Sequence, residues 1–319
     1  MSTVMRLDDI TLEYPVPRQY RKEDVLPSGV RIISLEVKQG EVFGLLGPNG
    51  AGKTTFLNIL GGTVIKSKGK LIAWGFDLDK NPRQVRASIG IVPQEVNLDA
   101  FFSPKKLLEL QAGLYGVTKK DRITDLILKM VALENKANAY SRSLSGGMKR
   151  RLLIAKAMVH QPPILILDEP TAGVDVELRK DMWLVVEDLR QTGVTIILTT
   201  HYIEEAEAIA DRVAVINQGE IIVVEDKNEL IKRMGHKKLT IELQDEILEI
   251  PKELAKYNLV INEKKMSLTY TYKARGEKTG ITDLLKDIKD AGLKLKDLIT
   301  EQSSLEKIFV DLVKENNEI

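Results

Sequence analysis

The sequence predicts an α/β fold followed by a smaller α+β domain at its C-terminal end. Over most of the chain, apolar runs typical of buried parallel strands, such as residues 164–167, alternate with helical patterns. From residue 239 onward, apolar residues instead alternate with polar ones, as in antiparallel strands, and two amphipathic helices follow. A charged, linker-like stretch around 229–238 separates the two parts. We therefore expect domains at residues 1–234 and 235–319.

The composition is that of a soluble globular protein. The chain has 319 residues, of which 43% are hydrophobic and 29% charged, enough for one large or two ordinary domains. Its 47 basic and 46 acidic residues nearly cancel, so no overall field attracts nucleic acid or an anionic membrane. The absence of cysteine excludes disulfides and thiolate metal sites. No apolar run approaches the roughly 20 residues of a spanning helix and no signal peptide is evident, so we expect any membrane role to be performed from the aqueous side.

The segment up to about Glu41 predicts short strands interrupted by prolines. Two aromatic residues in it, Tyr14 and Tyr20, are candidates for stacking on an adenine ring, which needs a flat partner. Each is equally well interpreted as an ordinary half-buried tyrosine, so both readings stay open.

A glycine-rich loop lies between a predicted strand and a predicted helix. It reads Gly47-Pro48-Asn49-Gly50-Ala51-Gly52-Lys53-Thr54-Thr55 and fits the phosphate-binding pattern G-x-x-x-x-G-K-[ST]. Glycines let successive N–H groups point at a phosphate, at a helix N-terminus whose dipole also favours negative charge. Lys53 would reach the β- and γ-phosphates, and the Thr54 hydroxyl would bind Mg²⁺. The loop therefore predicts nucleotide binding.

The next part of the chain predicts a helical insertion at about residues 95–160. A strand near 89–92 ends at Pro93-Gln94, and Ser103-Pro104 then forms a good cap and first turn for a helix with apolar residues at 107, 110 and 114. A second helix has apolar residues at 123, 126, 127 and 130.

Three further segments carry polar side chains at the ends of elements. Leu144-Ser145-Gly146-Gly147-Met148 precedes a helix with the basic run Lys149-Arg150-Arg151, and its N-terminus could accept an anion, although a simple cap and a solvated basic face are the commoner readings. The buried strand 164–167 ends in Asp168 and Glu169, and the strand 194–198 ends at Thr199-Thr200-His201. Because ligands bind at the carboxyl edge of parallel sheets and a P-loop protein needs a carboxylate near its metal, Asp168 and Glu169 are candidates for the metal site.

The remaining patterns complete the two domains. The pattern predicts strands at 213–216 and 221–224 joined by a hairpin turn at 217–219. The C-terminal part has strands at 239–243 and 268–272 and helices over 281–288 and 305–312, but no catalytic constellation.

Taken in order, these motifs resemble the nucleotide-binding subunit of ABC transporters over roughly Met5 to Glu225. The glycine-rich loop, Gln94, the Ser145-Gly146-Gly147 signature, Asp168-Glu169, Asp175 and His201 all occur in the family's order. The signature separates this family from other P-loop ATPases. The resemblance implies a RecA-like core with an antiparallel β subdomain and a helical subdomain.

The resemblance also implies a role for each matched position. Gly47 through Thr55 look like the Walker A loop, and Asp168 looks like the Walker B aspartate that acts on Mg²⁺ through water. Glu169 resembles the general base for the attacking water. Gln94 resembles the glutamine that contacts Mg²⁺ and senses the membrane partner, and His201 the histidine that holds the γ-phosphate and the water.

Two ATP molecules are sandwiched between head-to-tail subunits in proteins of this kind. Ser145, Gly146 and Gly147 resemble the signature that contacts the γ-phosphate bound by the other subunit, and Asp175 resembles the D-loop aspartate between the sites. One chain carries one set of motifs, so we expect a second nucleotide-binding subunit, identical or different, and an integral membrane transporter subunit. The resemblance implies a location on the cytoplasmic face of the membrane, with ATP and Mg²⁺ as cofactors and no nucleic-acid partner.

The sequence departs from the family pattern at two places. The segment from Pro15 to Val30 is longer than the usual link to the phosphate loop, so the stacking residue is either Tyr14 or Tyr20. Met148 replaces the commonest glutamine, a variant associated with exporters. The tail, with Ser304 through Phe309, resembles the extension of drug-resistance and ABC-2 type export ATPases; regulation and a dimerisation or folding role are equally good readings of it.

Two rival functions remain. The first is a soluble ABC ATPase acting on ribosomes, DNA or iron–sulfur assembly, against which the single motif set and the lack of a long coiled coil argue. The second is a regulatory module with a degenerate ATP site, which the filled catalytic positions disfavour. The cargo is not indicated by the sequence.

Overall fold

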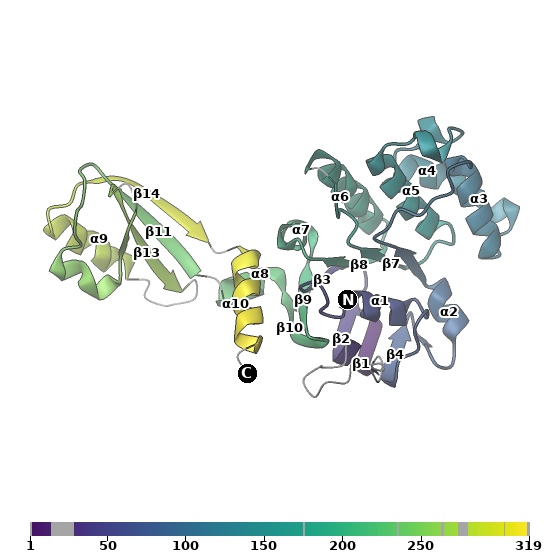
Figure 1. The fold of residues 1–319 in the computed structure, drawn as a ribbon, viewed down its shortest axis with the longest axis horizontal. Helices are drawn as coiled ribbons and strands as arrows, with labels where there is room; N and C mark the ends of the chain where they lie inside the picture. Colours follow the sequence, from purple (N-terminus) through teal and green to yellow (C-terminus); the bar gives the residue numbers. More distant parts are fainter. Residues whose placement is uncertain are drawn as a thin grey trace, which may run out of the picture. The chain divides into compact units, whose positions relative to one another are not determined.

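The computed structural model describes residues 2–13, 29–174, 176–234, 236–262, 265–273, 280–302 and 304–317. The chain forms two compact units, Met1–Glu225 and Asp226–Ile319 (Figure 1). The division lies somewhat before the expected one at 234/235, because the helix Lys227–Met234 contacts the C-terminal helix Leu305–Asn317 of the second unit.

A ten-stranded sheet forms the framework of the first unit, in the order β5-β4-β1-β2-β10-β9-β3-β8-β7-β6. Its strands are β1 (Thr3–Glu13), β2 (Gly29–Lys38), β3 (Val42–Leu46), β4 (Lys68–Ala73), β5 (Phe76–Asp77), β6 (Ile89–Val92), β7 (Ile164–Asp168), β8 (Thr195–Thr200), β9 (Arg212–Asn217) and β10 (Glu220–Asp226). Strands β9, β3, β8, β7 and β6 pair in parallel, whereas β1 pairs antiparallel with β2 and β4. The parallel part holds the site described below.

The parallel strands are apolar through their middle because each side of the sheet faces a separate hydrophobic core. On β7, Ile164 and Ile166 pack into one cluster with β1, β2 and the helix after β3, and Leu165 and Leu167 pack into the other with the helical insertion. Successive side chains of a strand point to opposite faces, so a strand covered on both faces needs apolar residues at every position. This is the pattern that predicted the α/β class, which the fold confirms.

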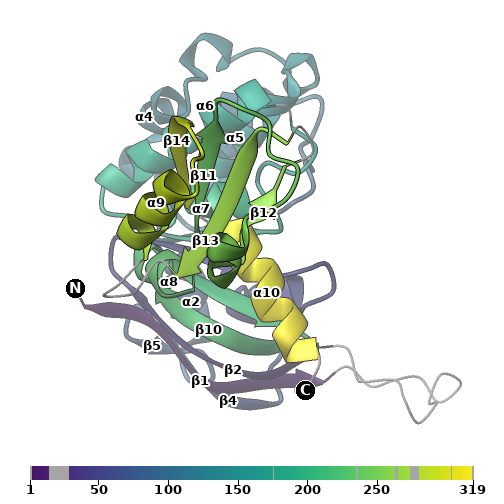
Figure 2. The same cartoon turned by 90° about the vertical axis from the view of Figure 1, so that its left-hand side faces the viewer.

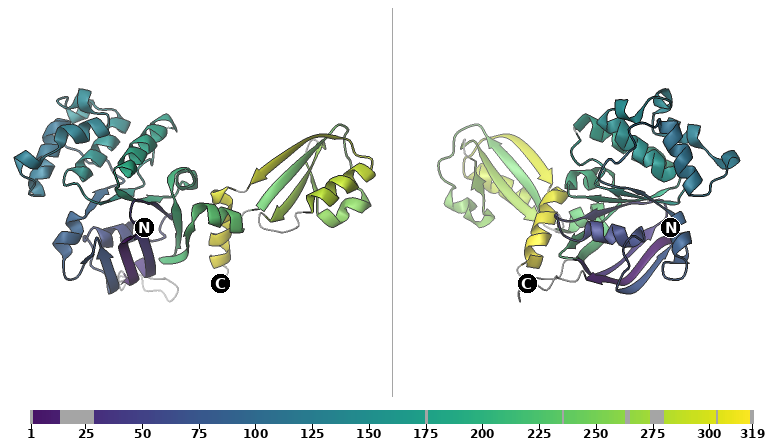
Figure 3. Two further views of the ribbon diagram at one scale, coloured as in Figure 1. Left: turned by 180° about the vertical axis from the view of Figure 1, so that it is seen from behind. Right: turned by 45° about the vertical axis from the view of Figure 1, so that its right-hand side comes forward.

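Seven α-helices occur among the described residues of the first unit. They are α1 (Lys53–Leu60), α2 (Pro82–Ala87), α3 (Pro104–Leu114), α4 (Thr124–Met130), α5 (Gly146–Met158), α6 (Val176–Gln191) and α7 (Ile203–Ile209), with short 3₁₀ turns at Lys119–Asp121, Glu134–Lys136 and Ser141–Ser143. Helix α3 begins as expected, with Ser103 accepting a hydrogen bond from the Lys106 N–H and proline in the first turn. Helices α3, α4 and α5 contact one another and lie together beside the sheet (Figures 1 and 3).

The second unit is a four-stranded antiparallel sheet with helices. It comprises α8 (Lys227–Met234), β11 (His236–Leu243), the 3₁₀ helix Lys252–Tyr257, β12 (Val260–Ile261), β13 (Ser267–Lys273), α9 (Ile281–Asp290), β14 (Leu295–Gln302) and α10 (Leu305–Asn317), with the sheet order β12-β13-β11-β14. Leu284 and Ile288 of α9 share a buried cluster with Leu239 and Ile241 of β11, so α9 covers one face of this sheet (Figure 2). No helix in the described ranges of the chain has the length and apolarity needed to cross a membrane.

Candidate functional site

The parallel strands bring segments from distant parts of the chain to one edge of the sheet. Leu46 at the end of β3 pairs with Thr200 of β8, and Asp168 at the end of β7 pairs with Thr199. The loops after the three strands therefore leave the sheet side by side. They enclose a pocket of about 500 Å³ lined by Pro48, Asn49, Gly50, Gly52, Lys53, Thr54, Thr55, Gln94, Glu169 and His201.

The loop before α1 is shaped by its glycines. A Cβ on Gly47 would lie 2.5 Å from the carbonyl oxygen of Ile216, so only glycine lets the loop approach β9 this closely. Gly50 and Gly52 have φ values of 82° and 104°, in the left-handed region that other residues avoid. Because Gly52 precedes the helix, no side chain caps the first turn of α1. Its N–H groups are thus available to an anion such as a phosphate.

Lys53 at the start of α1 is only 5% exposed and bends back over the loop. Its ammonium donates hydrogen bonds to the carbonyl oxygens of Gly47 at 2.6 Å and Pro48 at 3.2 Å, and its Nζ lies 3.6 Å from Oε1 of Glu169. Burial lowers the pKa of Lys53, while the Glu169 carboxylate acts in the opposite direction. The cation is held at the mouth of the phosphate loop, facing a carboxylate.

Glu169 is the residue on which the pocket's side chains converge. Its Oε2 accepts a hydrogen bond from Gln94 Nε2 at 3.2 Å and lies 3.0 Å from Nδ1 of His201. Its φ is +43°, a left-handed conformation that is uncommon outside glycine. Its N–H donates to the carbonyl oxygen of Thr199 on β8 at 3.0 Å, which fixes the turn after β7. A strained turn of this kind at a pocket points to a functional role for the side chain.

Asp168 lies beside Glu169 and is oriented by a neighbour on β8. The Thr199 hydroxyl donates a hydrogen bond to its Oδ1 at 2.6 Å. Burial raises the pKa of the Asp168 carboxyl, and the hydrogen bond from Thr199 opposes the shift. A cation bound nearby would favour the charged carboxylate.

The residues expected to hold Mg²⁺ fit a hard cation that shares its ligands with a nucleotide. Thr54 is exposed in the pocket and Gln94 lines the same pocket, whereas Asp168 is not among the lining residues and directly precedes Glu169, which is. Within the described part of the chain, no three His, Cys, Asp or Glu side chains cluster as a metal cage. Mg²⁺ commonly binds through one or two protein oxygens, water and substrate phosphates, so the hydroxyl, amide and carboxylate oxygens of these three residues would be sufficient protein ligands.

The signature residues lie elsewhere and do not line this pocket. Ser145 caps α5 by accepting a hydrogen bond from the Met148 N–H at 3.3 Å. A Cβ on Gly147 would lie 2.6 Å from Leu178 Cδ2, whereas a Cβ on Gly146 would meet open space. At the N-terminus of α5, Ser145 and Gly146 are thus exposed, whereas Gly147 is buried against Leu178.

Three expected site residues, Tyr14, Tyr20 and Asp175, lie outside the described residues. Sequence reasoning missed two residues that support the site. Thr199, which binds the Asp168 carboxylate and the backbone N–H of Glu169, was visible only as part of the Thr199-Thr200-His201 strand end. Arg150 was read as part of a solvated basic face, but it is only 9% exposed, and its guanidinium donates to the carbonyl oxygens of Gln94 and Ala172.

Known proteins are similar to this chain in sequence and in fold. The family model described as "ABC transporter" matches residues 30–172. The chain is 34% identical over 305 residues to the linearmycin resistance ATP-binding protein LnrL of Bacillus subtilis (strain 168), covering 93% of this chain and 96% of that protein. It is 40% identical over 216 residues to the Nod factor export ATP-binding protein I of Cupriavidus pinatubonensis, covering 67% of this chain and 66% of that protein.

One solved structure is similar in both fold and sequence. It is a dimeric, post-hydrolysis state of the ATP-binding cassette MJ0796 bound to ADP and phosphate. It superposes with a TM-score of 0.57 at 27% identity, covering 70% of this chain and 98% of that one.

Proposed function

This chain belongs to the ABC transporter family, and from that premise we propose that it is the ATP-hydrolysing subunit of an exporter, acting as one of two nucleotide-binding subunits that close on ATP. As a member of the family it is an ATPase whose hydrolysis is coupled to transport. The observation that supports the site most directly is the convergence of Lys53, Gln94 and His201 on Glu169 in one pocket.

The phosphate loop and Lys53 would bind the β- and γ-phosphates. The free N–H groups at the start of α1 face the pocket, and a phosphate would replace the carbonyl oxygens that now accept hydrogen bonds from Lys53. Mg²⁺ would be held by Thr54 and Gln94 directly and by Asp168 through water. The ion would neutralise charge on the phosphates.

Glu169 would take the proton from the attacking water. Its carboxylate already lies among Lys53, Gln94 and His201, so a water placed between it and the γ-phosphate would be oriented on several sides. His201 would hold this water and the γ-phosphate. Phosphoryl transfer of this kind depends mainly on positioning and on charge stabilisation, which these side chains provide.

A second nucleotide-binding subunit would complete the site. Ser145 and Gly146 are exposed at the N-terminus of α5, next to the buried Gly147, and all three lie outside the pocket of their own chain, so this helix end could meet the nucleotide of a partner. The similar cassette described as a dimer supports this arrangement. Asp175, which the resemblance places between the two sites, would act at the same interface.

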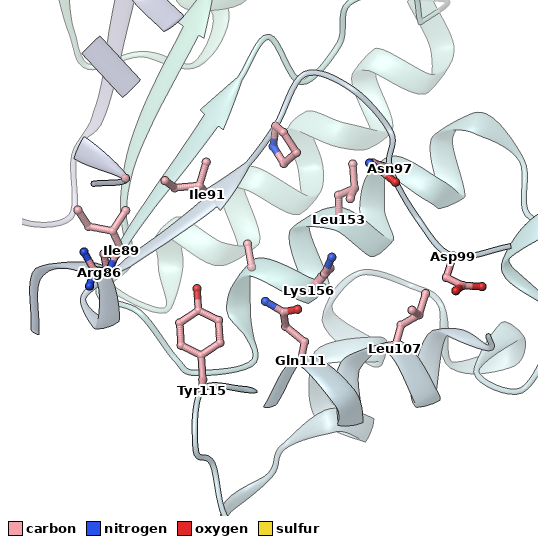
Figure 4. Close-up of a pocket in the computed structure, with 13 residues that line it drawn as sticks. Arg86, Ile89, Ile91, Asn97, Asp99, Leu107, Gln111, Tyr115, Leu153 and Lys156 are labelled. Carbon is pink, nitrogen blue, oxygen red and sulfur yellow. The ribbon is translucent and has the colours of Figure 1, made fainter. Parts of the chain in front are cut away.

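A groove next to the Gln94 loop would receive the membrane subunit. It has a volume of about 500 Å³ and lies between β6, α3 and α5, with Ile91, Gln111, Tyr115 and Lys156 among its lining residues (Figure 4). Pro93, which directly precedes Gln94, lines it as well. Movement of a segment in this groove would therefore reach Gln94 and, through it, Glu169.

Export as the direction of transport is supported by what the relatives are named for. One is a linearmycin resistance protein and another a Nod factor export protein. The protein would act at the cytoplasmic face of the membrane, where ATP is supplied. The second unit, which holds none of the proposed catalytic residues, would be an accessory domain.

A pull-down tests this proposal. Tagged Glu169→Gln protein, captured with ATP from detergent-solubilised cells, is expected to retain an integral membrane protein in stoichiometric amount, because the variant should stay closed on unhydrolysed ATP. The control is the same capture without nucleotide. Recovery of ribosomes, nucleic acid or a soluble assembly partner instead of a membrane protein would favour the rival function of a soluble ABC ATPase.

A further inference from the structure

Arg150 lies in the second turn of α5, five residues after the Ser145 cap, and points inward. It is 9% exposed, and burial lowers the pKa of its guanidinium. It forms no ion pair with any carboxylate in the described parts of the chain. Burying an unpaired cation costs stability, so its presence here calls for a reason other than packing.

Both ends of the guanidinium hold backbone carbonyls. Nη1 donates to the carbonyl oxygen of Gln94 at 2.8 Å, and Nη2 donates to the carbonyl oxygen of Ala172 at 2.6 Å. These carbonyls belong to two different segments, the loop after β6 and the turn after β7. The guanidinium is planar and its two terminal NH₂ groups donate in fixed directions, like the prongs of a fork, so it can bind two carbonyl oxygens at once.

Each of the two segments also contacts Glu169. The side chain of Gln94 donates to Glu169 Oε2 at 3.2 Å, and the N–H of Ala172 donates to the carbonyl oxygen of Glu169 at 3.1 Å. Arg150 therefore touches neither the pocket nor Glu169, but it fixes the two pieces of backbone from which Glu169 is held.

We propose that Arg150 is a positioning residue that ties the Gln94 loop and the turn after Glu169 to the signature helix α5. This inference rests on the proposed catalytic roles of Gln94 and Glu169. The N-terminus of α5 carries Ser145, Gly146 and Gly147, so any shift of α5 when a partner's nucleotide binds there is passed by the fork to Gln94 and to the Glu169 turn. Arg150 thereby links contact at one ATP site to the geometry of the base at the other.

The chain offers a matched control one residue away. Arg151 lies on the same helix and also donates to two backbone carbonyls, those of Val131 at 3.2 Å and Ala132 at 3.5 Å. These carbonyls belong to the helical insertion and do not contact Glu169. Arg151 uses the single nitrogen Nη1 for both contacts, whereas Arg150 uses Nη1 and Nη2. Arg150→Lys and Arg151→Lys make the same change from guanidinium to ammonium, but only Arg150 holds backbone that contacts Glu169.

The test measures ATP hydrolysis and MgATP affinity in the full-length protein. We expect Arg150→Lys to lower kcat by about tenfold to a hundredfold, as misplacement of a catalytic group by about 1 Å does, and to change MgATP affinity by less than about threefold. Arg151→Lys should keep kcat within about twofold of wild type. A wild-type kcat in Arg150→Lys, or an equal loss in both variants, overturns the inference.

A double-mutant cycle with Gln94→Ala shows whether Arg150 acts through Gln94. Because Arg150 holds the Gln94 loop, Arg150→Lys should cost much less kcat when the Gln94 side chain is already absent. Fully additive losses would overturn the action of Arg150 through Gln94 and leave only the hydrogen bond to the Ala172 carbonyl oxygen as its route to Glu169. Glu169→Gln provides the check on the proposed function itself: if that variant hydrolyses ATP normally, the assignment of the site fails, whereas an inactive Glu169→Gln beside a fully active Arg150→Lys refutes only the role of Arg150.

Protein stability is controlled by thermal unfolding of each variant. If Arg150→Lys unfolds at a much lower temperature than Arg151→Lys, the same kinetic comparison is made with Arg150→Gln, whose neutral amide leaves no unpaired buried charge. Loss of the fold in both Arg150 variants would show that Arg150 serves folding and would overturn the positioning role.

Discussion

At the scale of single residues, the site depends on one carboxylate held in an unfavourable backbone conformation. Glu169 has φ +43° and is 8% exposed, yet three polar side chains converge on it. Such a conformation costs of order 1–3 kcal/mol and persists only where the surroundings enforce it. Here the hydrogen bonds from the Glu169 N–H to Thr199 and from the Ala172 N–H to the Glu169 carbonyl oxygen do so.

We predict that Glu169→Gln binds MgATP with an affinity near that of wild type but loses about 10²- to 10⁴-fold in kcat, the usual contribution of a general base. The amide keeps the size and the contacts with Lys53 and Gln94 but cannot accept the proton. Equilibrium binding of ATP and steady-state phosphate release measure the two quantities. Wild-type turnover in this variant would remove Glu169 from the role of base.

We also predict that Gly47→Ala disrupts the phosphate loop. The added Cβ would lie 2.5 Å from the carbonyl oxygen of Ile216 and 2.8 Å from Cγ2 of the same residue, so the backbone of the loop must move. Overpacking of this kind costs about 1–3 kcal/mol, and we expect both a lower unfolding temperature and at least about tenfold weaker ATP binding.

The matched control for Gly47→Ala is Gly113→Ala in α3. Its Cβ would meet only Arg122 Nη2 at 3.5 Å, an ordinary contact, in a helix where alanine is favoured over glycine. We expect this control to be neutral or slightly more stable. Unchanged ATP affinity in Gly47→Ala would show that the loop does not need the close approach to β9.

At the scale of secondary structure, the sequence predicted the elements whose local pattern agrees with their environment. The buried strand β7 and the helix α3 are examples. A strand that is buried on both faces has a continuous apolar run, and the start of α3 has the Ser103-Pro104 pair, so both can be recognised from the sequence. Strand β14 was not predicted, since its residues 295–302 do not alternate and pair only on one side as an edge strand. Leu110 and Leu114 were expected on an apolar face but are 44% and 83% exposed, which helical period alone cannot foresee.

The proposed site residues follow the same division. Lys53, Glu169 and His201 could be proposed from the sequence because each belongs to a short motif at the end of a strand. Thr199 and Arg150 were not, because their roles depend on contacts with residues 30 or 56 positions away in the chain, which only the fold brings together. Long-range hydrogen bonds to backbone carbonyls carry no local sequence signal.

His160, two residues after the end of α5, should make the stability of the folded chain depend on pH. The His160 ring stacks on the ring of Tyr115, which directly follows α3, with 3.8 Å between the ring centroids. Its Nε2 lies 3.3 Å from the Ile89 carbonyl oxygen. Burial lowers the pKa of His160 below its usual value of 6.5, so the unfolded chain binds the proton more readily than the folded one. Its contribution to stability is therefore present above pH 6.5 and is lost progressively as the pH falls below that value.

We predict that wild type loses more thermal stability than His160→Phe between about pH 7.5 and about pH 5.5. Phenylalanine keeps the ring that stacks on Tyr115 but cannot take up a proton. Carboxylates elsewhere affect both proteins alike, so the difference between the two pH slopes isolates His160. Identical slopes would mean that His160 is not protonated more readily on unfolding.

At the scale of the whole molecule, the chain is two units whose boundary follows packing rather than composition. The charged stretch around 229–238 was expected to be a linker, but residues 227–234 form helix α8, whose Leu230 is fully buried. Helix α8 contacts α10, and Leu305 and Ile308 of α10 are buried as well. A charged amphipathic helix and a linker have similar compositions, so the sequence alone could not separate them.

This packing predicts opposite behaviour for two truncated chains that differ by only a few residues. A chain ending at Glu225 lacks both α8 and α10, whereas one ending at Met234 keeps α8 without its partner. An isolated helix of eight residues is not stable in water, and leaving one leucine uncovered costs about 1.5–3 kcal/mol of burial. We therefore expect the shorter chain to be monomeric with a single cooperative unfolding transition and normal ATP binding, and the longer one to bind more of a hydrophobic dye and to associate.

Gel filtration, dye fluorescence and ATP binding on both chains measure this difference, and Leu230→Lys in the longer chain should abolish the dye binding. If the chain ending at Glu225 aggregates while the one ending at Met234 behaves well, helix α8 belongs to the first unit and the boundary lies where the sequence placed it.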